Sequence, residues 1–140
     1  VLFRSFVTVP LLENALATGK QICLPRVDRA SHGLVIHAVA DPHNDVQAGV
    51  LGIREPRPTC PQAALNAIDF VLVPGVAFTP RAERLGYGGG YYDRLIERFE
   101  QRPPLVAAAY AVQMRDALPL TENDRNIDLV LTEDAEYCGC

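Results

Sequence analysis

The stretch Arg84-Leu-Gly-Tyr-Gly-Gly-Gly-Tyr-Tyr-Asp93 decides how the rest of the chain is interpreted. Four of its residues are glycines, three of them in a row. Because glycine has no Cβ, neighbouring residues here are free to take positive φ and to turn their N–H groups toward one point. A concavity of main-chain amides of this kind binds anions, above all phosphate. The stretch therefore predicts a phosphate-binding loop.

A helical pattern follows the glycines directly. Leu95, Ile96 and Phe99 fall on one face, which predicts a helix from about Tyr91 to Gln101 that ends before two prolines. The loop then meets a helix N-terminus, where unpaired N–H groups favour negative charge.

Two charged residues frame the loop. Arg84 carries a guanidinium suited to a bidentate grip on a phosphoryl group, and Asp93 carries a carboxylate suited to Mg²⁺. A plainer interpretation stays open, in which the glycines form a surface turn, Asp93 favours the helix start, and Tyr91 and Tyr92 are ordinary core or rim aromatics.

The spacing excludes the two commonest nucleotide motifs. No lysine follows the glycines, as a P-loop requires, and a dinucleotide fingerprint counted from Gly86 would need a glycine at Tyr91.

Apolar runs predict the strands around this loop. The continuous run Phe70–Val73 is typical of a central strand buried on both faces, and it leads toward the glycine loop. We expect further strands at 21–24 (ended by Pro25), 34–40, 105–110 and 129–132, a helix from Thr8 to Gly19, and a loop over 41–61 with one short strand near Gln47.

This alternation predicts an α/β fold: a three-layer, mostly parallel, Rossmann-like sheet with helices on both faces, as in sugar-phosphate isomerases and CoA transferases. Ligands bind such sheets outside the carboxyl ends of the strands. We expect the glycine loop and the segment Glu122–Asp124, just before the last strand, to meet there.

Length and composition suit one enzyme-sized domain. The 140 residues are 49% hydrophobic with a formal net charge of −4, which predicts a single domain over 1–140 and argues against nucleic acid or an anionic membrane as partner. No apolar run approaches the ~20 residues that span a bilayer. The cysteines show no Cys-x-x-Cys spacing, so we expect no structural zinc and a reducing cytoplasm. For His32, His37 and His43 we expect surface or capping positions.

The segment Asp69-Phe-Val-Leu-Val-Pro-Gly-Val-Ala-Phe78, followed by Arg84–Asp93, resembles the signature of the 5-formyltetrahydrofolate cyclo-ligase family, also called methenyltetrahydrofolate synthetases. Weaker matches appear in the family's order, at Leu24-Pro25-Arg26, at Glu55-Pro56 and at Glu122-Asn123-Asp124. The resemblance covers nearly the whole chain, from about Thr8 to Glu133.

The resemblance implies an ATP- and Mg²⁺-dependent ligase of one-carbon metabolism. In that reaction the formyl oxygen of 5-formyltetrahydrofolate is phosphorylated, N10 closes the ring, and 5,10-methenyltetrahydrofolate, ADP and phosphate are released. Such chemistry depends on positioning and charge neutralisation. The partners expected are folate and ATP, with no nucleic acid and no membrane, and the protein is expected to be a monomer.

The resemblance also assigns site residues. Those expected to bind ATP are Arg84, Leu85, Gly86, Tyr87, Gly88, Gly89, Gly90, Tyr91 and Tyr92. The substrate contacts are Tyr87, Gly88, Gly89, Gly90 and Tyr91; the catalytic residues are Arg84, Tyr91 and Asp93; and the metal ligands are Asp93 and Asp124.

The chain departs from the family pattern at its start. Nothing ahead of Ser5 matches the basic segment that contacts ATP in the family, and Ser5 stands where the family carries a folate-binding glutamate. We therefore expect a domain that lacks its N-terminal helix-strand segment. The open alternatives are a nucleotide- or folate-binding domain without turnover, and another α/β enzyme acting on phosphorylated small molecules.

Overall fold

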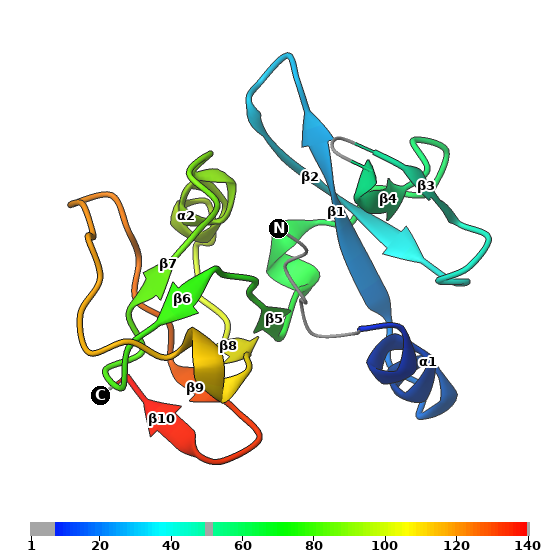
Figure 1. Ribbon diagram of the computed structural model, residues 1–140. Coiled ribbons are helices and arrows are strands. Elements are labelled where there is room, and N and C mark those ends of the chain that lie inside the picture. The colour runs from blue at the N-terminus through cyan, green and yellow to red at the C-terminus, as the bar shows by residue number, and fades with distance from the viewer. Residues whose placement is uncertain (1–7, 50–51, 140) are drawn as a thin grey trace. The chain divides into compact units, whose positions relative to one another are not determined.

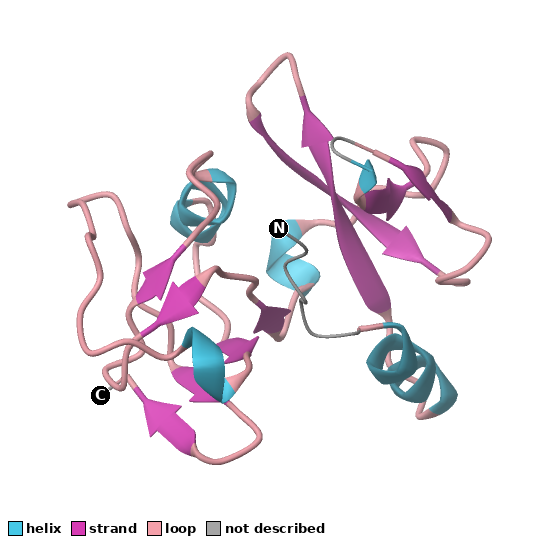
Figure 2. Cartoon of the chain, in the orientation of Figure 1, coloured by secondary structure: helices cyan, strands magenta, loops and turns pink. Residues whose placement is uncertain are grey.

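The computed structural model describes residues 8–49 and 52–139, and these form two compact units. The N-unit comprises the described residues up to Ala67, and the C-unit comprises residues 68–139. Figure 1 labels the elements of both units, and Figure 2 separates helices, strands and loops by colour. The glycine loop lies in the C-unit.

The N-unit begins with helix α1, Val9–Ala17, which confirms the predicted helix. Thr8 is its N-cap residue and a proline lies in its first turn, but the Thr8 side chain makes no capping hydrogen bond. Gly19 has φ +83°, the left-handed conformation that commonly ends a helix. None of the residues of α1 is fully buried, and Leu11 of its apolar stripe is 43% exposed.

Strands β1 (Ile22–Asp28) and β2 (Gly33–Val39) form an antiparallel pair in which Pro25 faces Ile36. The prediction that Pro25 ends the first strand is wrong. Among the described strands β1 pairs only with β2, and an edge strand tolerates proline because the missing N–H is not needed for a second partner.

The expected surface or capping position of His37 is also wrong, since this side chain in β2 is fully buried.

The segment predicted as a loop with one strand holds two. Strands β3 (Val46–Ala48) and β4 (Arg54–Pro56) form a second antiparallel pair. Their shortness explains why the sequence pattern showed only one of them. A 3₁₀ turn at Leu65–Ala67 closes the unit.

The C-unit contains a four-stranded sheet in the order β10-β9-β8-β5. Its strands are β5 (Val71–Leu72), β8 (Leu105–Ala108), β9 (Leu129–Leu131) and β10 (Glu136–Cys138). The β5–β8 and β8–β9 pairings are parallel and β9–β10 is antiparallel, so this sheet is mostly parallel, as predicted. Strand β10 was not anticipated.

The prediction of a central strand at Phe70–Val73 is wrong for the described sheet. Strand β5 lies at its edge, Phe70 is 53% exposed, and only Val73 of this run is buried. The strand between two parallel neighbours is β8, in which Leu105 and Ala107 are fully buried. An apolar run marks a strand but does not fix its place in the sheet.

Four short elements complete the C-unit. Strands β6 (Ala77–Phe78) and β7 (Arg84–Leu85) form a hairpin, and helix α2 spans Tyr91–Glu97. The helix begins at the predicted residue and ends about a turn earlier. A 3₁₀ turn follows β8 at Ala111–Gln113. The core gathers these elements around the sheet, with Phe78, Leu105, Ile127 and Val130 fully covered.

The chain is thus of the α/β class, with mixed strand pairings and few helices. The predicted three-layer arrangement and single domain stay predictions. No helix within the described residues has the length and apolarity to cross a membrane.

Candidate functional site

Arg84 lies at the start of β7 and turns its side chain into the protein. The side chain is 2% exposed; Nη1 donates to the Pro74 carbonyl at 2.9 Å and Nη2 to Asp93 Oδ1 at 3.2 Å. Its Nε is buried and has no hydrogen-bond partner among the described residues. A buried charge needs a partner of opposite sign, and Asp93 supplies it.

Glycines make room for this arginine. A Cβ on Gly86 would lie 2.9 Å from Arg84 Nη1, and one on Gly75 would lie 2.6 Å from Phe78 Cζ and 3.0 Å from Arg84 Cγ. At each glycine the shortest of these distances is below 3.0 Å, so a side chain would not fit without a shift. These two glycines are therefore required by packing around the guanidinium.

Asp93 occupies the first turn of α2 and is itself nearly buried. Its Oδ1 accepts two hydrogen bonds, from Arg84 Nη2 and from the main-chain N–H of Arg125 at 3.0 Å. Its Oδ2 accepts none from the described residues. The carboxylate is therefore held through Oδ1.

The glycine loop between β7 and α2 has the backbone that the sequence predicts. Gly88 has φ +96° and Gly90 has φ +67°, conformations that glycine reaches without strain. The main-chain N–H groups from Tyr87 through Asp93 donate no hydrogen bond to any described residue. Unused donors on such a backbone are the ingredients of an anion site.

The three tyrosines of the loop have different surroundings. Tyr87 is 64% exposed. The ring of Tyr91 lies under the Arg94 guanidinium, 5.1 Å from its Cζ, and fills the space where a side chain on Gly89 would stand. Tyr92 packs against the core, and burial raises its pKa to about 12. Tyr87 is thus the most accessible ring of the three, and Tyr92 the most enclosed.

The expected meeting of Glu122–Asp124 with the glycine loop stays a prediction, but this part of the chain contacts helix α2 directly after the loop. The contact runs through the next residue, Arg125, whose N–H binds Asp93 and whose guanidinium bonds Glu97 Oε1 of the same helix. Asp124 forms a turn: its Oδ2 accepts hydrogen bonds from the N–H and the hydroxyl of Thr121, at 2.6 and 3.2 Å. Both carboxylates expected to bind metal thus lie on neighbouring segments, each with an oxygen outside these bonds.

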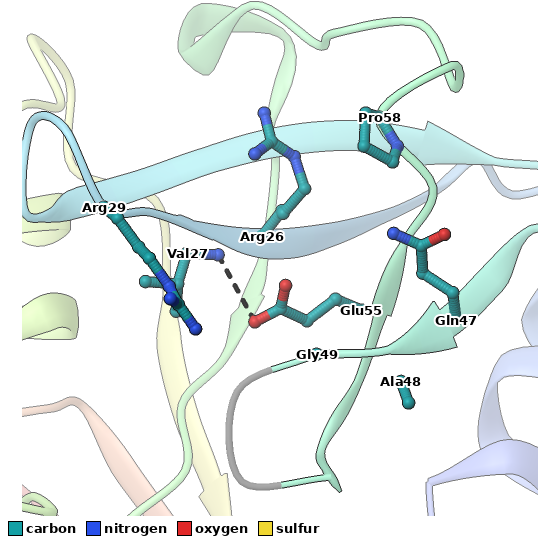
Figure 3. Close-up of a pocket in the computed structure, with 8 residues that line it drawn as sticks. All are labelled: Arg26, Val27, Arg29, Gln47, Ala48, Gly49, Glu55 and Pro58. Carbon is teal, nitrogen blue, oxygen red and sulfur yellow. Dashed lines mark hydrogen bonds between the residues drawn. The ribbon is translucent and has the colours of Figure 1, made fainter.

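The N-unit holds a separate pocket of about 440 Å³, drawn in Figure 3. Glu55 of β4 lies in it, with Oε1 3.5 Å from the Val27 N–H and its side chain against Gly49, where a Cβ would come within 2.3 Å of Glu55 Cδ. Arg26 turns its side chain away from this carboxylate, and its Nε donates to buried His37. The pocket is lined by Arg26, Val27, Arg29, Gln47, Ala48, Gly49, Glu55 and Pro58.

Comparison with known proteins then decides the family. The sequence profile of the 5-formyltetrahydrofolate cyclo-ligase family matches residues 5–133. The chain belongs to this family. The match includes the glycine loop, both carboxylates, and the Glu55 pocket.

Individual cyclo-ligases agree with this assignment. The chain is 31% identical to the 5-formyltetrahydrofolate cyclo-ligase of Escherichia coli K12, over 89% of this chain and 70% of that protein. It is 29% identical to a probable 5-formyltetrahydrofolate cyclo-ligase of Caenorhabditis elegans, over 90% of this chain and 66% of the relative. The chain thus spans about two thirds of the length of these curated relatives.

Solved structures share the fold. The Aquifex aeolicus 5,10-methenyltetrahydrofolate synthetase superposes with a TM-score of 0.77 at 32% identity, over 94% of this chain and 64% of that one. The Mycoplasma pneumoniae 5,10-methenyltetrahydrofolate synthetase gives a TM-score of 0.66 at 24% identity, over 90% and 63%. The second likeness concerns the fold alone.

The structure adds residues that the sequence reasoning missed. Pro74 contributes a carbonyl to Arg84, while Arg125 and Glu97 join the Asp124 turn to α2. Glu97 is four residues after Asp93, so helical spacing could have placed it on the same face. Nothing in the sequence indicates the Pro74 carbonyl. Ser5, at the position of the expected folate glutamate, lies outside the described residues.

Proposed function

We propose that this chain carries the site of a 5-formyltetrahydrofolate cyclo-ligase. The reaction closes 5-formyltetrahydrofolate to 5,10-methenyltetrahydrofolate at the expense of ATP, through phosphorylation of the formyl oxygen. The family assignment supports the choice of reaction, and the C-unit offers the groups that it needs.

One observation carries the proposal: the main-chain N–H groups from Tyr87 through Asp93 donate no hydrogen bond within residues 8–49 and 52–139. Main-chain donors that are already placed stabilise transferred phosphoryl charge without reorganising during the reaction. Gly88 and Gly90 permit this arrangement by their positive φ, and the exposed ring of Tyr87 is available to stack on a pterin or adenine ring. We propose ATP contacts for residues 85–92 and folate contacts for residues 87–91, with the side chain of Arg84 supporting the loop.

The carboxylates fit a hard cation. Asp93 Oδ2 accepts no hydrogen bond from the described residues, and Asp124 commits only Oδ2 to its turn. Mg²⁺ prefers oxygen ligands and binds through one or two carboxylates together with substrate phosphates. We propose that Asp93 and Asp124 hold Mg²⁺, which would neutralise charge on the transferring phosphoryl group.

Arg84 fits a supporting role in this site. Its guanidinium is bonded to Pro74 and Asp93 beneath the loop, so direct contact with a phosphate would require it to leave this position. From where it lies, it orients Asp93 and places positive charge below the amides. We propose that Tyr91, at the end of the loop, contacts the substrate through its hydroxyl group.

The test uses the full chain with two separate measurements. Calorimetric titration with ADP, with and without Mg²⁺, measures nucleotide binding. The appearance of methenyltetrahydrofolate absorbance on mixing 5-formyltetrahydrofolate, ATP and Mg²⁺ measures turnover. We expect Mg²⁺-dependent binding and ATP-dependent turnover. Binding without turnover would identify a nucleotide-binding domain, and turnover without ATP would overturn the proposal in favour of another α/β enzyme.

The remaining expectations belong to the same proposal. We propose a cytoplasmic, monomeric enzyme built as one three-layer domain, acting on small molecules. Sedimentation of the full chain measures its oligomeric state.

A further inference from the structure

We propose that Arg125 is a positioning residue, which holds the Asp124 turn against α2 so that Asp124 and Asp93 address the same cation. This inference rests on the proposed function, because it concerns the metal that the two carboxylates are proposed to bind. We call the two bonds of Arg125, its N–H to Asp93 and its guanidinium to Glu97, the Arg125 clamp.

The clamp grips two successive turns of one helix face. Asp93 and Glu97 are four residues apart on α2, so their side chains lie on the same side. Arg125 bonds Asp93 through its main-chain N–H and Glu97 through its guanidinium. Two contacts at different heights along a helix fix both the distance and the rotation of the segment that makes them.

The clamp is the turn's connection to the rest of the C-unit. The Asp124 turn is tied internally, by Asp124 N–H to the Thr121 carbonyl and by the Asp124 carboxylate to Thr121. Within the described chain, residues 117–125 make hydrogen bonds to the rest of the unit only through Arg125. Arg125 therefore holds the turn between its two flanking residues, Asp116 and Asn126, whose carbonyls accept hydrogen bonds from Arg81 and Arg102.

The Arg125–Glu97 ion pair lies where it can position the turn without adding much to the stability of the fold. The side chains of Arg125 and Glu97 are 44% and 48% exposed, and exposed ion pairs add little to global stability. Loss of the pair should therefore leave the fold in place while it loosens the turn. The loosened turn brings Asp124 to the cation less often, which lowers the affinity for metal.

The experiment compares variants of the full chain by calorimetric titration of Mg²⁺ into its complex with ADP, and by hydrogen exchange of residues 117–125. We expect Arg125→Ala and Glu97→Gln to weaken Mg²⁺ binding by about 2–5-fold and to speed exchange in this segment, with an unchanged thermal midpoint. The double variant Arg125→Glu with Glu97→Arg should recover most of the affinity.

Glu13→Gln is the control. Glu13 forms an exposed ion pair with His43 in the N-unit, and this pair includes no residue of the C-unit. Glu13→Gln should leave Mg²⁺ affinity unchanged.

The outcomes distinguish the clamp from the proposed function. If the unmodified chain binds ADP without any effect of Mg²⁺, the metal site fails and the clamp's role falls with it. If Mg²⁺ binds the unmodified chain and Arg125→Ala alike, with equal exchange in 117–125, the proposed function stands and the clamp is overturned.

Discussion

The two units surround a carboxylate differently: Asp93 is enclosed by the protein, and Glu55 lines an open pocket. In the C-unit, Asp93 is nearly buried, paired with a guanidinium that is itself buried, and bonded to the Arg125 main chain. In the N-unit, Glu55 lies in an open pocket and accepts one hydrogen bond, at 3.5 Å from Val27. An ion pair removed from water carries a large desolvation cost, so its two members depend on each other; a carboxylate at the surface does not. The comparison indicates that the C-unit site is held in a fixed geometry while the pocket is adaptable.

The largest effect is expected at the buried pair. Asp93→Asn leaves the Arg84 charge buried without a counter-charge, which should lower the free energy of unfolding of the C-unit by about 3–5 kcal/mol. Denaturant unfolding monitored by hydrogen exchange in each unit measures this free energy of unfolding separately for the two units. The variant should also lose Mg²⁺-dependent ADP binding. A loss of metal binding with full stability would show that Arg84 does not need Asp93 for its charge.

Alkaline pH should destabilise the C-unit through Tyr92. All five tyrosines lie beyond residue 86, in the C-unit, and burial raises the pKa of Tyr92 from 10.0 to about 12. A raised folded-state pKa means that the folded protein disfavours the ionised phenol. The stabilisation is complete below pH 10 and is lost as the pH rises toward 12, by at most about 3 kcal/mol. Unfolding measured across this window in the unmodified protein and in Tyr92→Phe should show the smaller decline in the variant. Equal declines would place the alkaline effect elsewhere.

Glycine substitutions provide a matched test of rigidity in the two units. Gly75→Ala pushes a Cβ into Phe78, which is fully buried and cannot move, so we expect a cost of about 1–3 kcal/mol. Gly49→Ala pushes a Cβ into the Glu55 side chain, which can swing into solvent, and should cost less. Thermal unfolding of the two variants compares them directly. A larger loss at Gly49 would mean that the pocket is as fixed as the buried pair.

The same contrast explains what the sequence could predict. The glycine loop, the start of α2 and the strands at Leu105 and Leu129 are local patterns, and the structure confirms them. The expected meeting of the loop with Glu122–Asp124 stays a prediction, since the structure brings the following residue, Arg125, to Asp93 of α2.

What failed depends on tertiary contacts. The place of β5 at the sheet edge, the run of β1 through Pro25 and the burial of His37 are decided by neighbours far along the chain. The periodicity of a local stretch of sequence does not depend on these distant neighbours, so it could not predict the three features. The inward direction of Arg84 is of this kind too, because a guanidinium before a glycine loop fits a phosphate contact as well as a buried ion pair.

The smallest effect is expected at Glu55. Glu55→Gln keeps the shape of the side chain and an oxygen that can accept from Val27, and it removes a charge that has no ion-pair partner among the described residues. Glu55 is half-buried and its one hydrogen bond is long, so the free energy of unfolding should change by less than about 1 kcal/mol. Chemical denaturation of Glu55→Gln and of Asp93→Asn under identical conditions measures the change in unfolding free energy for each variant. A loss at Glu55 as large as that at Asp93 would contradict the distinction between a fixed and an adaptable carboxylate, because it would show that the open pocket depends on its charge as strongly as the buried site does.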